Sequence, residues 1–583
     1  MDERSPAQVF TPLDHQFARF ITMRSGLTGS QAVGFELLIK RLSASLSSGD
    51  SCLPVNREEE QRLREIINVC HDITTPLTSS PPPPSPLVLW QGRLYLQRYY
   101  RYETRLAVQL QGLARIQDEG VDSAALLDTC FGPDTEQAPD WQRRAADLAL
   151  KRPLALISGG PGTGKTRTVA QILGLLLLVF GPDLHIALAA PTGKAAMRLR
   201  ESIAKNLETL TFSPSIKEKI PTGASTLHRL LGVQRYSSGF RHHHGNPLPW
   251  DVVVVDEASM VDLAMMSKLV DALKPGARLI LLGDKDQLAS VESGAVLADC
   301  IGALADNTVE LKKSYRFNQE IEAFARAVNT SDSSTAWALL DRGQAADTGT
   351  VGAVRLLHEP LPDFICTQYL RYMQKIAVQG QSEYHADDIR RLFQAFNRFR
   401  VLCATKRGVQ SVEAINRQVE RDLAAHGFPC QPGNWYPGRP VMILQNDYTL
   451  NLFNGDVGIC LPEAATTTAD PADLGNLGNQ KRFQIWFERE DGSLKGYQPS
   501  MLPAHETVFA MTIHKSQGSE FTEVLVVLPS SDSPLLTREL IYTAITRAKE
   551  RVLIAGDQAI FHAAVQRTIS RSSGLQAMLT SLR

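Results

Sequence analysis

The chain has 583 residues, which is too long for one hydrophobic core and predicts about three to four domains. It carries 61 lysines and arginines against 62 aspartates and glutamates, a net charge of −1. This balance excludes a protein that is basic throughout and coats nucleic acid, so any such contact must be local. The eight cysteines form no C-x-x-C pair, which gives no sign of a zinc ribbon or an iron–sulfur cluster.

Two further features favour a chain of the reducing cytoplasm. The first residues have no apolar signal core. The longest apolar run, Ile172 to Phe180, is too short to cross a bilayer and is better explained as a buried helix. We therefore expect a cytoplasmic protein without a membrane segment.

Residues 1–135 are predicted to form a mostly helical N-terminal domain, because apolar residues recur three and four apart in Asp14–Phe20 and Phe35–Ile39. Five prolines within 79–86 predict a stiff, extended linker. Two apolar runs within 87–96 flank Gln-Gly and predict a β-hairpin, with an aromatic-rich helix after it. The aromatic side chains could stack on bases, but a half-buried hairpin and helix is the simpler interpretation.

The strongest motif follows the apolar strand Leu154–Ile157. Its glycines allow a tight turn in which backbone N–H groups point at a phosphate chain, and the helix after it adds its positive N-terminal end. We predict that Lys165 reaches the β- and γ-phosphates of ATP and that the hydroxyl of Thr166 binds Mg²⁺. The loop residues are Gly159, Gly160, Pro161, Gly162, Thr163, Gly164, Lys165 and Thr166.

Two candidate contacts flank this loop. Gln142 lies on a predicted amphipathic helix before it, and its amide could both donate to and accept from an adenine edge, although such a residue is more often simply solvated. After the next strand, His185–Ala190, the pair Pro191-Thr192 opens another helix. Thr192 could hold a phosphate of a polynucleotide there, or this could be an ordinary strand-to-helix turn.

Two more apolar strands end in polar side chains. Val252–Val255 runs into Asp256-Glu257, and we predict that Asp256 holds Mg²⁺ while Glu257 orients or deprotonates the attacking water. Leu279–Leu282 runs into Gly-Asp-Lys-Asp-Gln, and Gln287 could bond the γ-phosphate and sense hydrolysis. These groups should meet at the carboxyl edge of one parallel sheet.

The remaining half contains another strand and an insertion. Arg398–Thr405 begins with a strand pattern, and short alternating segments such as Arg482–Phe487 predict a small SH3-like barrel at 436–504. The polar run 464–480 is predicted to be a loop. Three adjacent histidines, 242–244, do not suggest a metal site, because consecutive residues diverge and no carboxylate or cysteine joins them at ligand spacing.

Taken in order, these motifs resemble superfamily 1 helicases. Gly-Lys-Thr, Asp-Glu-Ala-Ser and Gly-Asp-x-x-Gln-Leu are followed by segments similar to the fourth, fifth and sixth motifs of that superfamily, at 311–317, 511–521 and 540–549. Segments 225–232, 438–443 and 454–458 are similar to the RecD family within its 1B branch. The resemblance implies that Tyr315 stacks on adenine, that Arg316 and Arg547 act as arginine fingers, and that the backbone of DNA contacts Pro191, Thr192, Thr512, His514 and Ser516.

The resemblance also implies an α/β architecture of two RecA-like lobes. We expect the first lobe at 136–357, with a strand-separating hairpin near 233–250. The second lobe is expected at 358–435 and 505–583.

By the same resemblance, the chain is expected to be an ATP-dependent 5′-to-3′ DNA helicase subunit of a RecBCD-type heterotrimer. RecB-like and RecC-like subunits would be its partners, the nuclease would lie in a partner, and the N-terminal domain would dock on the RecC-like subunit. Two alternatives stay open: a stand-alone RecD-like helicase, although no Gly-rich helix-hairpin-helix repeat precedes the core, and an NTP-driven DNA-binding switch or scaffold that does not unwind.

Overall fold

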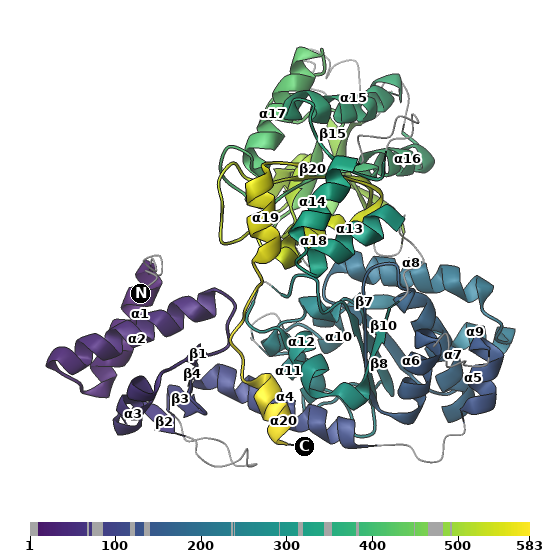
Figure 1. Ribbon diagram of the computed structural model, residues 1–583. Coiled ribbons are helices and arrows are strands. Elements are labelled where there is room, and N and C mark those ends of the chain that lie inside the picture. Colours follow the sequence, from purple (N-terminus) through teal and green to yellow (C-terminus); the bar gives the residue numbers. More distant parts are fainter. Residues whose placement is uncertain are drawn as a thin grey trace, which may run out of the picture.

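The computed structural model describes residues 10–582 except 67–68, 73–84, 117–122, 133–139, 235–236, 238, 291, 313–318, 343–351, 380–383, 448, 464–481 and 490–491. The chain folds into two α/β lobes, an antiparallel insertion and an N-terminal domain (Figure 1). Most of the predicted proline linker lies outside the described residues. Among the described residues, no helix has the length and apolar character needed to span a bilayer.

The first lobe contains a six-stranded sheet in which all neighbours are parallel, in the order β10-β5-β9-β8-β6-β7. Its central strands are buried on both faces, as parallel sheets require. The strands are β5 (Leu154–Gly159), β6 (Ile186–Ala190), β7 (Ala224–Thr226), β8 (Val252–Val255), β9 (Arg278–Gly283) and β10 (Thr308–Leu311).

Side chains that alternate along β5 and β8 divide this lobe into two cores. Ala155, Val252 and Val254 pack under one helical layer, and Leu156 and Val253 under the other. The first layer contains α5 (Ala124–Phe131), α6 (Trp141–Lys151), α7 (Lys165–Phe180), α8 (Gly193–Thr209) and α9 (Pro214–Lys219). The second contains α4 (Gln97–Arg115), α10 (Leu227–Leu231), α11 (Leu263–Asp271), α12 (Val296–Ala303) and α20 (Leu575–Ser581).

The second lobe contains a five-stranded parallel sheet in the order β11-β20-β19-β12-β18. Its strands are β11 (Val354–Leu356), β12 (Phe399–Cys403), β18 (Ala510–Thr512), β19 (Phe521–Val527) and β20 (Ala548–Ala555). Around it lie α13 (Gln319–Asn329), α14 (Ser333–Arg342), α15 (Leu361–Gln379), α16 (Ala386–Asn397), α17 (Val412–Ala425), α18 (Arg538–Ile545) and α19 (Gln558–Gln566).

Two lobe boundaries differ from those predicted. The described residues 319–342 and 354–356 join the second lobe instead of the first, because β11 pairs with β20 and α13 and α14 bury their apolar faces in the second core. The chain end at 575–581 returns to the first lobe, where α20 packs between α4 and α12 (Figure 1). The partner of each apolar face is a long-range contact, which local sequence patterns do not specify.

The N-terminal domain contains the predicted hairpin, β3 (Leu87–Trp90) and β4 (Arg93–Leu96), within the sheet β1-β4-β3-β2. Its turn residues Gln91 and Gly92 have φ of 45° and 69°, as a two-residue hairpin turn needs. The other elements are α1 (Pro12–Ser25), α2 (Gly29–Ser47), β1 (Leu53–Pro54), α3 (Arg57–Glu65) and β2 (Cys70–Asp72). The predicted boundary at 135 is too late, because α4 already packs on α11 of the first lobe.

The insertion is an antiparallel sheet in the order β16-β15-β14-β13-β17, with its own small core. It contains β13 (Pro440–Ile443), β14 (Val457–Pro462), β15 (Phe483–Glu488), β16 (Leu494–Tyr497) and β17 (His505–Thr507). Short antiparallel strands were predicted here from the alternating pattern in 482–487.

Candidate nucleotide site and lobe interface

The predicted phosphate loop turns from β5 into α7. Gly162 and Gly164 both have φ of 82°, a left-handed conformation that glycine adopts without strain. Lys165 begins α7, and its Nζ donates to the carbonyl oxygens of Gly159 and Gly160 over 2.5 and 3.1 Å. The Thr163 hydroxyl also donates to Gly160 O over 2.8 Å. The loop is therefore closed around its own lysine, beside the N-terminus of a helix, where phosphate groups bind.

Gln142 lies beside this loop, as its place before the motif predicted. Its Nε2 donates to Thr163 O over 3.4 Å, and Asp140 caps the same helix by accepting from the backbone of Gln142. Lys312 Nζ lies over the ring of the neighbouring Trp141, 4.7 Å from its centroid. Tyr315 and Arg316 lie outside the described residues.

Asp256 and Glu257 follow the carboxyl end of β8. The Asp256 carboxylate accepts from the backbone N–H of Glu257 over 2.9 Å. Burial, and secondly the charge of Glu257, raise the pKa of Asp256 to about 6, while Lys165 opposes that rise. Glu257 has φ of 52°, a conformation that costs a non-glycine residue about 1 kcal/mol and is typical of functional sites. Strain and clustered charge thus coincide where β8 ends.

Asp284 and Gln287 connect the end of β9 to the second lobe. Asp284 accepts from Gln287 Nε2 over 3.0 Å and from the Tyr542 hydroxyl over 3.1 Å. Gln287 Oε1 accepts from the guanidinium of Arg547 over 2.7 Å. Burial raises the pKa of Asp284 to about 6, against the effect of Lys165. The Gly-Asp-x-x-Gln-Leu motif and the sixth motif therefore form one network across the lobe interface, beside the nucleotide loop.

Arg547 is 2% exposed and is held from three sides. Besides Gln287, it donates to Thr543 O over 3.2 Å and Ser519 O over 3.4 Å. Burial lowers its pKa, and the charge of Glu257 opposes that effect. The planar guanidinium stays charged and suits phosphate oxygens. Arg547 thus occupies the interface at which a nucleotide held by the first lobe would meet the second.

Of the predicted DNA contacts, Thr192 lies next to the fifth motif. It caps α8 by accepting from Ala195 N over 3.3 Å, and a Cβ added to Gly518 would come within 3.3 Å of its Oγ1. Pro191 directly precedes it. Thr512 Oγ1 accepts from Lys515 N over 3.3 Å. Burial lowers the pKa of the nearby His514.

Ser516 does not fit the role given to it. Its side chain is fully buried, and its hydroxyl donates to Ile513 O over 2.6 Å. The hydroxyl therefore closes a local turn instead of facing a strand of DNA. The family resemblance implied a DNA contact here, but the chain forms a 3-10 turn (η5, His514–Ser516) that buries the Ser516 side chain.

Two contacts across the lobe interface were missed from the sequence. Tyr542 bonds Asp284 across the lobes, and Arg198 of α8 forms an ion pair with Glu520 of the second lobe. Asp284 carried a signal, because it ends an apolar strand beside Gln287. Tyr542 and Glu520 carried none, since their partners lie more than 200 residues away in the chain.

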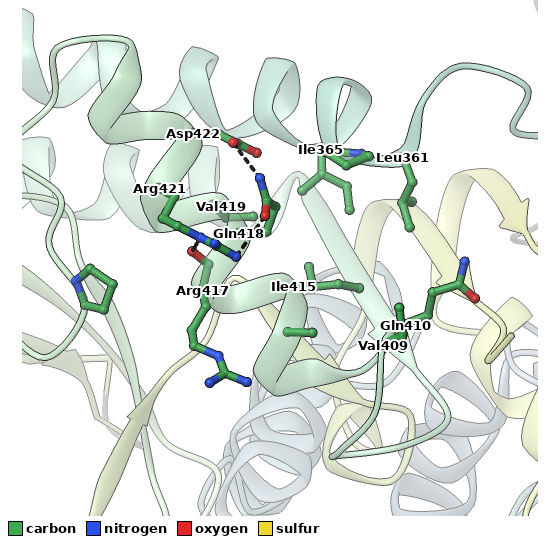
Figure 2. A pocket seen from close by; sticks show the side chains of 13 residues that line it. Leu361, Ile365, Val409, Gln410, Ile415, Arg417, Gln418, Val419, Arg421 and Asp422 are labelled. Atoms are coloured by element: carbon green, nitrogen blue, oxygen red, sulfur yellow. Dashed lines mark hydrogen bonds between the residues drawn. The ribbon is translucent and has the colours of Figure 1, made fainter.

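A separate groove of about 730 Å³ lies between α15 and α17 of the second lobe (Figure 2). Leu361, Ile365 and Ile415 contribute apolar surface to it, and Gln418 bonds both Arg421 and Asp422 at one side. None of the predicted nucleotide or DNA residues lines this groove. It is therefore distinct from the site described above.

Two family models match the chain. The model described as an AAA domain matches residues 142–293, and the UvrD-like helicase C-terminal domain matches 507–555. The first contains Gln142, the phosphate loop and Gln287, and the second contains the fifth motif and Arg547. Together with the two parallel sheets and the network between them, these matches identify an ATP-dependent DNA helicase.

Relatives identify the family more narrowly. The chain is 41% identical to the RecBCD enzyme subunit RecD of Mycolicibacterium smegmatis, over 87% of this chain and 85% of that protein. It is 35% identical to the RecD subunit of Haemophilus influenzae, over 85% and 82% of the two chains. The ATP-dependent RecD2 DNA helicase of Deinococcus radiodurans is 30% identical, but the match covers 59% of its length. The chain belongs to the RecD family of RecBCD enzyme subunits.

Proposed function

We propose that this chain unwinds DNA in the 5′-to-3′ direction as one motor of a cytoplasmic heterotrimer with RecB-like and RecC-like subunits. In this proposal the complex processes duplex ends in recombinational double-strand-break repair and degrades linear DNA, and a partner contains the nuclease. The observation that carries the proposal is the hydrogen bond from Arg547 to Gln287, because it connects nucleotide-site residues of one lobe to a cation of the other.

The nucleotide site fits ATP with Mg²⁺. Asp256 is a half-buried carboxylate whose pKa is raised to about 6, so a divalent cation at its oxygens would relieve the cost of its negative charge. Thr166 and Asp256 are the residues that would hold Mg²⁺. The ion would neutralise charge on the phosphates. Glu257 would orient the attacking water, and Lys165 would exchange its loop carbonyls for phosphate oxygens.

We further propose that nucleotide changes the partner of Arg547. In the structure its guanidinium donates to Gln287, Thr543 O and Ser519 O. A γ-phosphate near Gln287 offers a stronger, charged acceptor. Transfer of Arg547 to that phosphate would close the lobes, and loss of the phosphate on hydrolysis would let them reopen. Arg316 would act as a second finger and Tyr315 would stack on adenine, as the family pattern implies.

The DNA path is proposed to run over Pro191, Thr192, Thr512 and His514, where α8 approaches the fifth motif. The hairpin near 233–250 would meet the duplex. Its described part has bridges between Val233 and Phe240 and between His243 and Asn246. Phe240 also lies 5.3 Å beneath the ammonium of Lys268 on α11, which would hold the hairpin against the first lobe. The insertion is proposed to be an SH3-like barrel beside this path.

The N-terminal domain is proposed to dock on the RecC-like subunit. Large apolar side chains are exposed on α1 and α2: Leu13 (70%), Phe20 (48%), Met23 (76%), Val33 (70%) and Leu37 (51%). Apolar surface gathered on two adjacent helices marks an interaction site more often than scattered exposure does. The family supplies the identity of the partner in this proposal.

An unwinding assay with the purified complex tests the proposal. A duplex with a 5′ single-stranded tail should be separated in the presence of ATP and Mg²⁺, and one with only a 3′ tail should not be separated by this motor. DNA-stimulated ATP hydrolysis without strand separation would favour the switch or scaffold instead. Unwinding by this chain without partners would favour a stand-alone helicase.

A further inference from the structure

Residues 569–574, the crossing segment, pass from the second lobe to the first. The backbone N–H of Ile569 donates to Glu539 of the second lobe over 3.0 Å. Two residues later, the guanidinium of Arg571 donates to first-lobe carbonyls of Ser290, Glu292 and Gly294 over 2.5, 2.9 and 3.0 Å. Two residues of extended chain span about 7 Å at most. This short span holds the two lobes close together at this edge, and a rotation about the edge would disturb these bonds less than a separation would.

The crossing segment also binds the N-terminal domain. Ser572 N donates to Asp50 over 2.7 Å, and Ser51 N donates back to Ser572 O over 3.0 Å. Gly294 N donates to Gly49 O over 2.9 Å. Gly49 has φ of 94°, a conformation that favours glycine, and a Cβ added there would lie 2.9 Å from the guanidinium carbon of Arg571. One arginine is thus packed between the first lobe and the N-terminal domain.

A buried carboxylate fixes the far end of the segment. Glu103 of α4 is fully buried and accepts from the Ser573 hydroxyl over 3.0 Å, Gly574 N over 3.1 Å and the Tyr95 hydroxyl over 3.1 Å. A Cβ on Gly574 would come within 2.0 Å of the Tyr95 hydroxyl. Directly after it, α20 buries its apolar side chains in the first lobe. These contacts fix this end of the crossing segment to the first lobe.

The loop whose carbonyls Arg571 binds directly continues the Gly-Asp-x-x-Gln-Leu motif. At its start, Leu288 N donates to the Thr543 hydroxyl over 2.9 Å, and Leu288 O accepts from Gln517 over 3.0 Å. Both partners belong to the second lobe. At its end, Arg571 donates to the carbonyls of Ser290, Glu292 and Gly294, and Gly49 O accepts from Gly294 N. The loop after Gln287 therefore contacts both the second lobe and the N-terminal domain.

We propose that the crossing segment is a mechanical tether and that Arg571 is its positioning residue. Rotation of the second lobe on nucleotide binding would move Arg571, and Arg571 would move loop 290–294 together with loop 46–51 of the N-terminal domain. The state of the ATP site and the position of the N-terminal domain are then coupled. Because such coupling is reciprocal, a partner bound to the N-terminal domain would alter nucleotide affinity.

Hydrogen exchange on the full chain tests the tether, with Mg²⁺ and a non-hydrolysable ATP analogue as the probe. In the natural chain, exchange in segments 46–51 and 290–294 should change on the order of tenfold when the analogue binds, the factor for one charge-assisted hydrogen bond. Arg571→Ala should still show protection of the phosphate loop by the analogue but lose the change in 46–51. Arg571→Lys keeps the cation but reaches fewer carbonyls, and should show a weaker change.

Arg567→Ala is the matched control. Like that of Arg571, its guanidinium donates to backbone carbonyls. These are Ser533 O and Leu536 O, and both lie in the second lobe. This variant should keep the full change in 46–51. An undiminished change in both Arg571 variants, or no change in the natural chain, would overturn the tether. The readout needs only nucleotide binding, so its failure is distinct from a failure of 5′-to-3′ unwinding.

Discussion

The guanidinium of Arg547 donates to Gln287 Oε1 over 2.7 Å and so joins the second lobe to the first. Gln287 also bonds Asp284, which in turn accepts from Tyr542. Four side chains from two lobes therefore form one buried network beside the phosphate loop. A change at the nucleotide can reach the second lobe through these bonds.

Replacing Arg547 should slow ATP turnover strongly. If the residue serves as an arginine finger, Arg547→Ala should reduce turnover on the order of 10³-fold, while nucleotide binding at Lys165 persists. Steady-state ATP hydrolysis with single-stranded DNA, beside equilibrium nucleotide binding, measures both. Arg551→Ala is a control, because that arginine pairs with Glu523 inside the second lobe. A loss of ATP turnover below about tenfold for Arg547→Ala would contradict the role of an arginine finger.

Glu257→Gln should separate binding from chemistry. The amide keeps the shape of the side chain at φ of 52° but cannot accept a proton from water. Nucleotide affinity should stay nearly normal while turnover falls about 10²-fold or more. Fluorescent-nucleotide titration and single-turnover hydrolysis report the two steps. Loss of nucleotide affinity itself would argue against this assignment.

Buried carboxyls should make the folded chain less stable as pH rises. Burial raises the pKa of Glu103 to about 7, so the folded state keeps a proton that the unfolded chain releases at lower pH. Stability from this group is therefore fully present below its unfolded pKa and is lost as pH rises toward 7, by about 3 kcal/mol at most. Asp256, Asp284 and Asp299, with pKa values raised to about 6, act in the same direction.

Urea unfolding between pH 5 and 8 measures this effect. The transition midpoint of the natural chain should fall as pH rises, and Glu103→Gln, which cannot ionise, should show a flatter dependence. Equal slopes for the two chains would remove Glu103 as the cause. A midpoint that rises with pH would contradict the sign.

Charges on the exposed face of the N-terminal helices should block assembly. The double change Met23→Asp and Leu37→Asp replaces side chains that are 76% and 51% exposed, so the domain should fold while its apolar surface is lost. Co-purification with a RecC-like partner should fail, and ATP hydrolysis should remain. Met501→Asp, at a methionine that is 50% exposed on the insertion, is the matched control. Normal assembly of the double variant would refute docking through this face.

The sequence predicted the parts of the site that depend on local order. Each apolar run before Gly159, Asp256 and Gln287 became a strand of one parallel sheet, so the residues after them meet at one edge. Segment 482–487 was predicted by alternation, and β15 confirms it.

What the sequence did not predict depends on distant partners. The three-residue strand β11 carries no pattern that names β20, nearly two hundred residues later, as its neighbour. The return of α20 to the first lobe and the bond from Tyr542 to Asp284 were also not predicted, because both depend on partners far away in the chain. Ser516 was misjudged because a 3-10 turn buries its side chain, which the motif alone does not reveal.

The proposal that this chain unwinds DNA by hydrolysing ATP is tested by strand separation with the assembled complex. The natural chain is compared with Lys165→Gln. Lys165 is held by loop backbone and bonds only loop carbonyls in the described structure, so the change should leave the fold intact and abolish ATP hydrolysis at this site. We expect this motor to unwind 5′-tailed duplexes in the natural complex and not in the Lys165→Gln complex. Undiminished 5′-tail unwinding by the Lys165→Gln complex would contradict it.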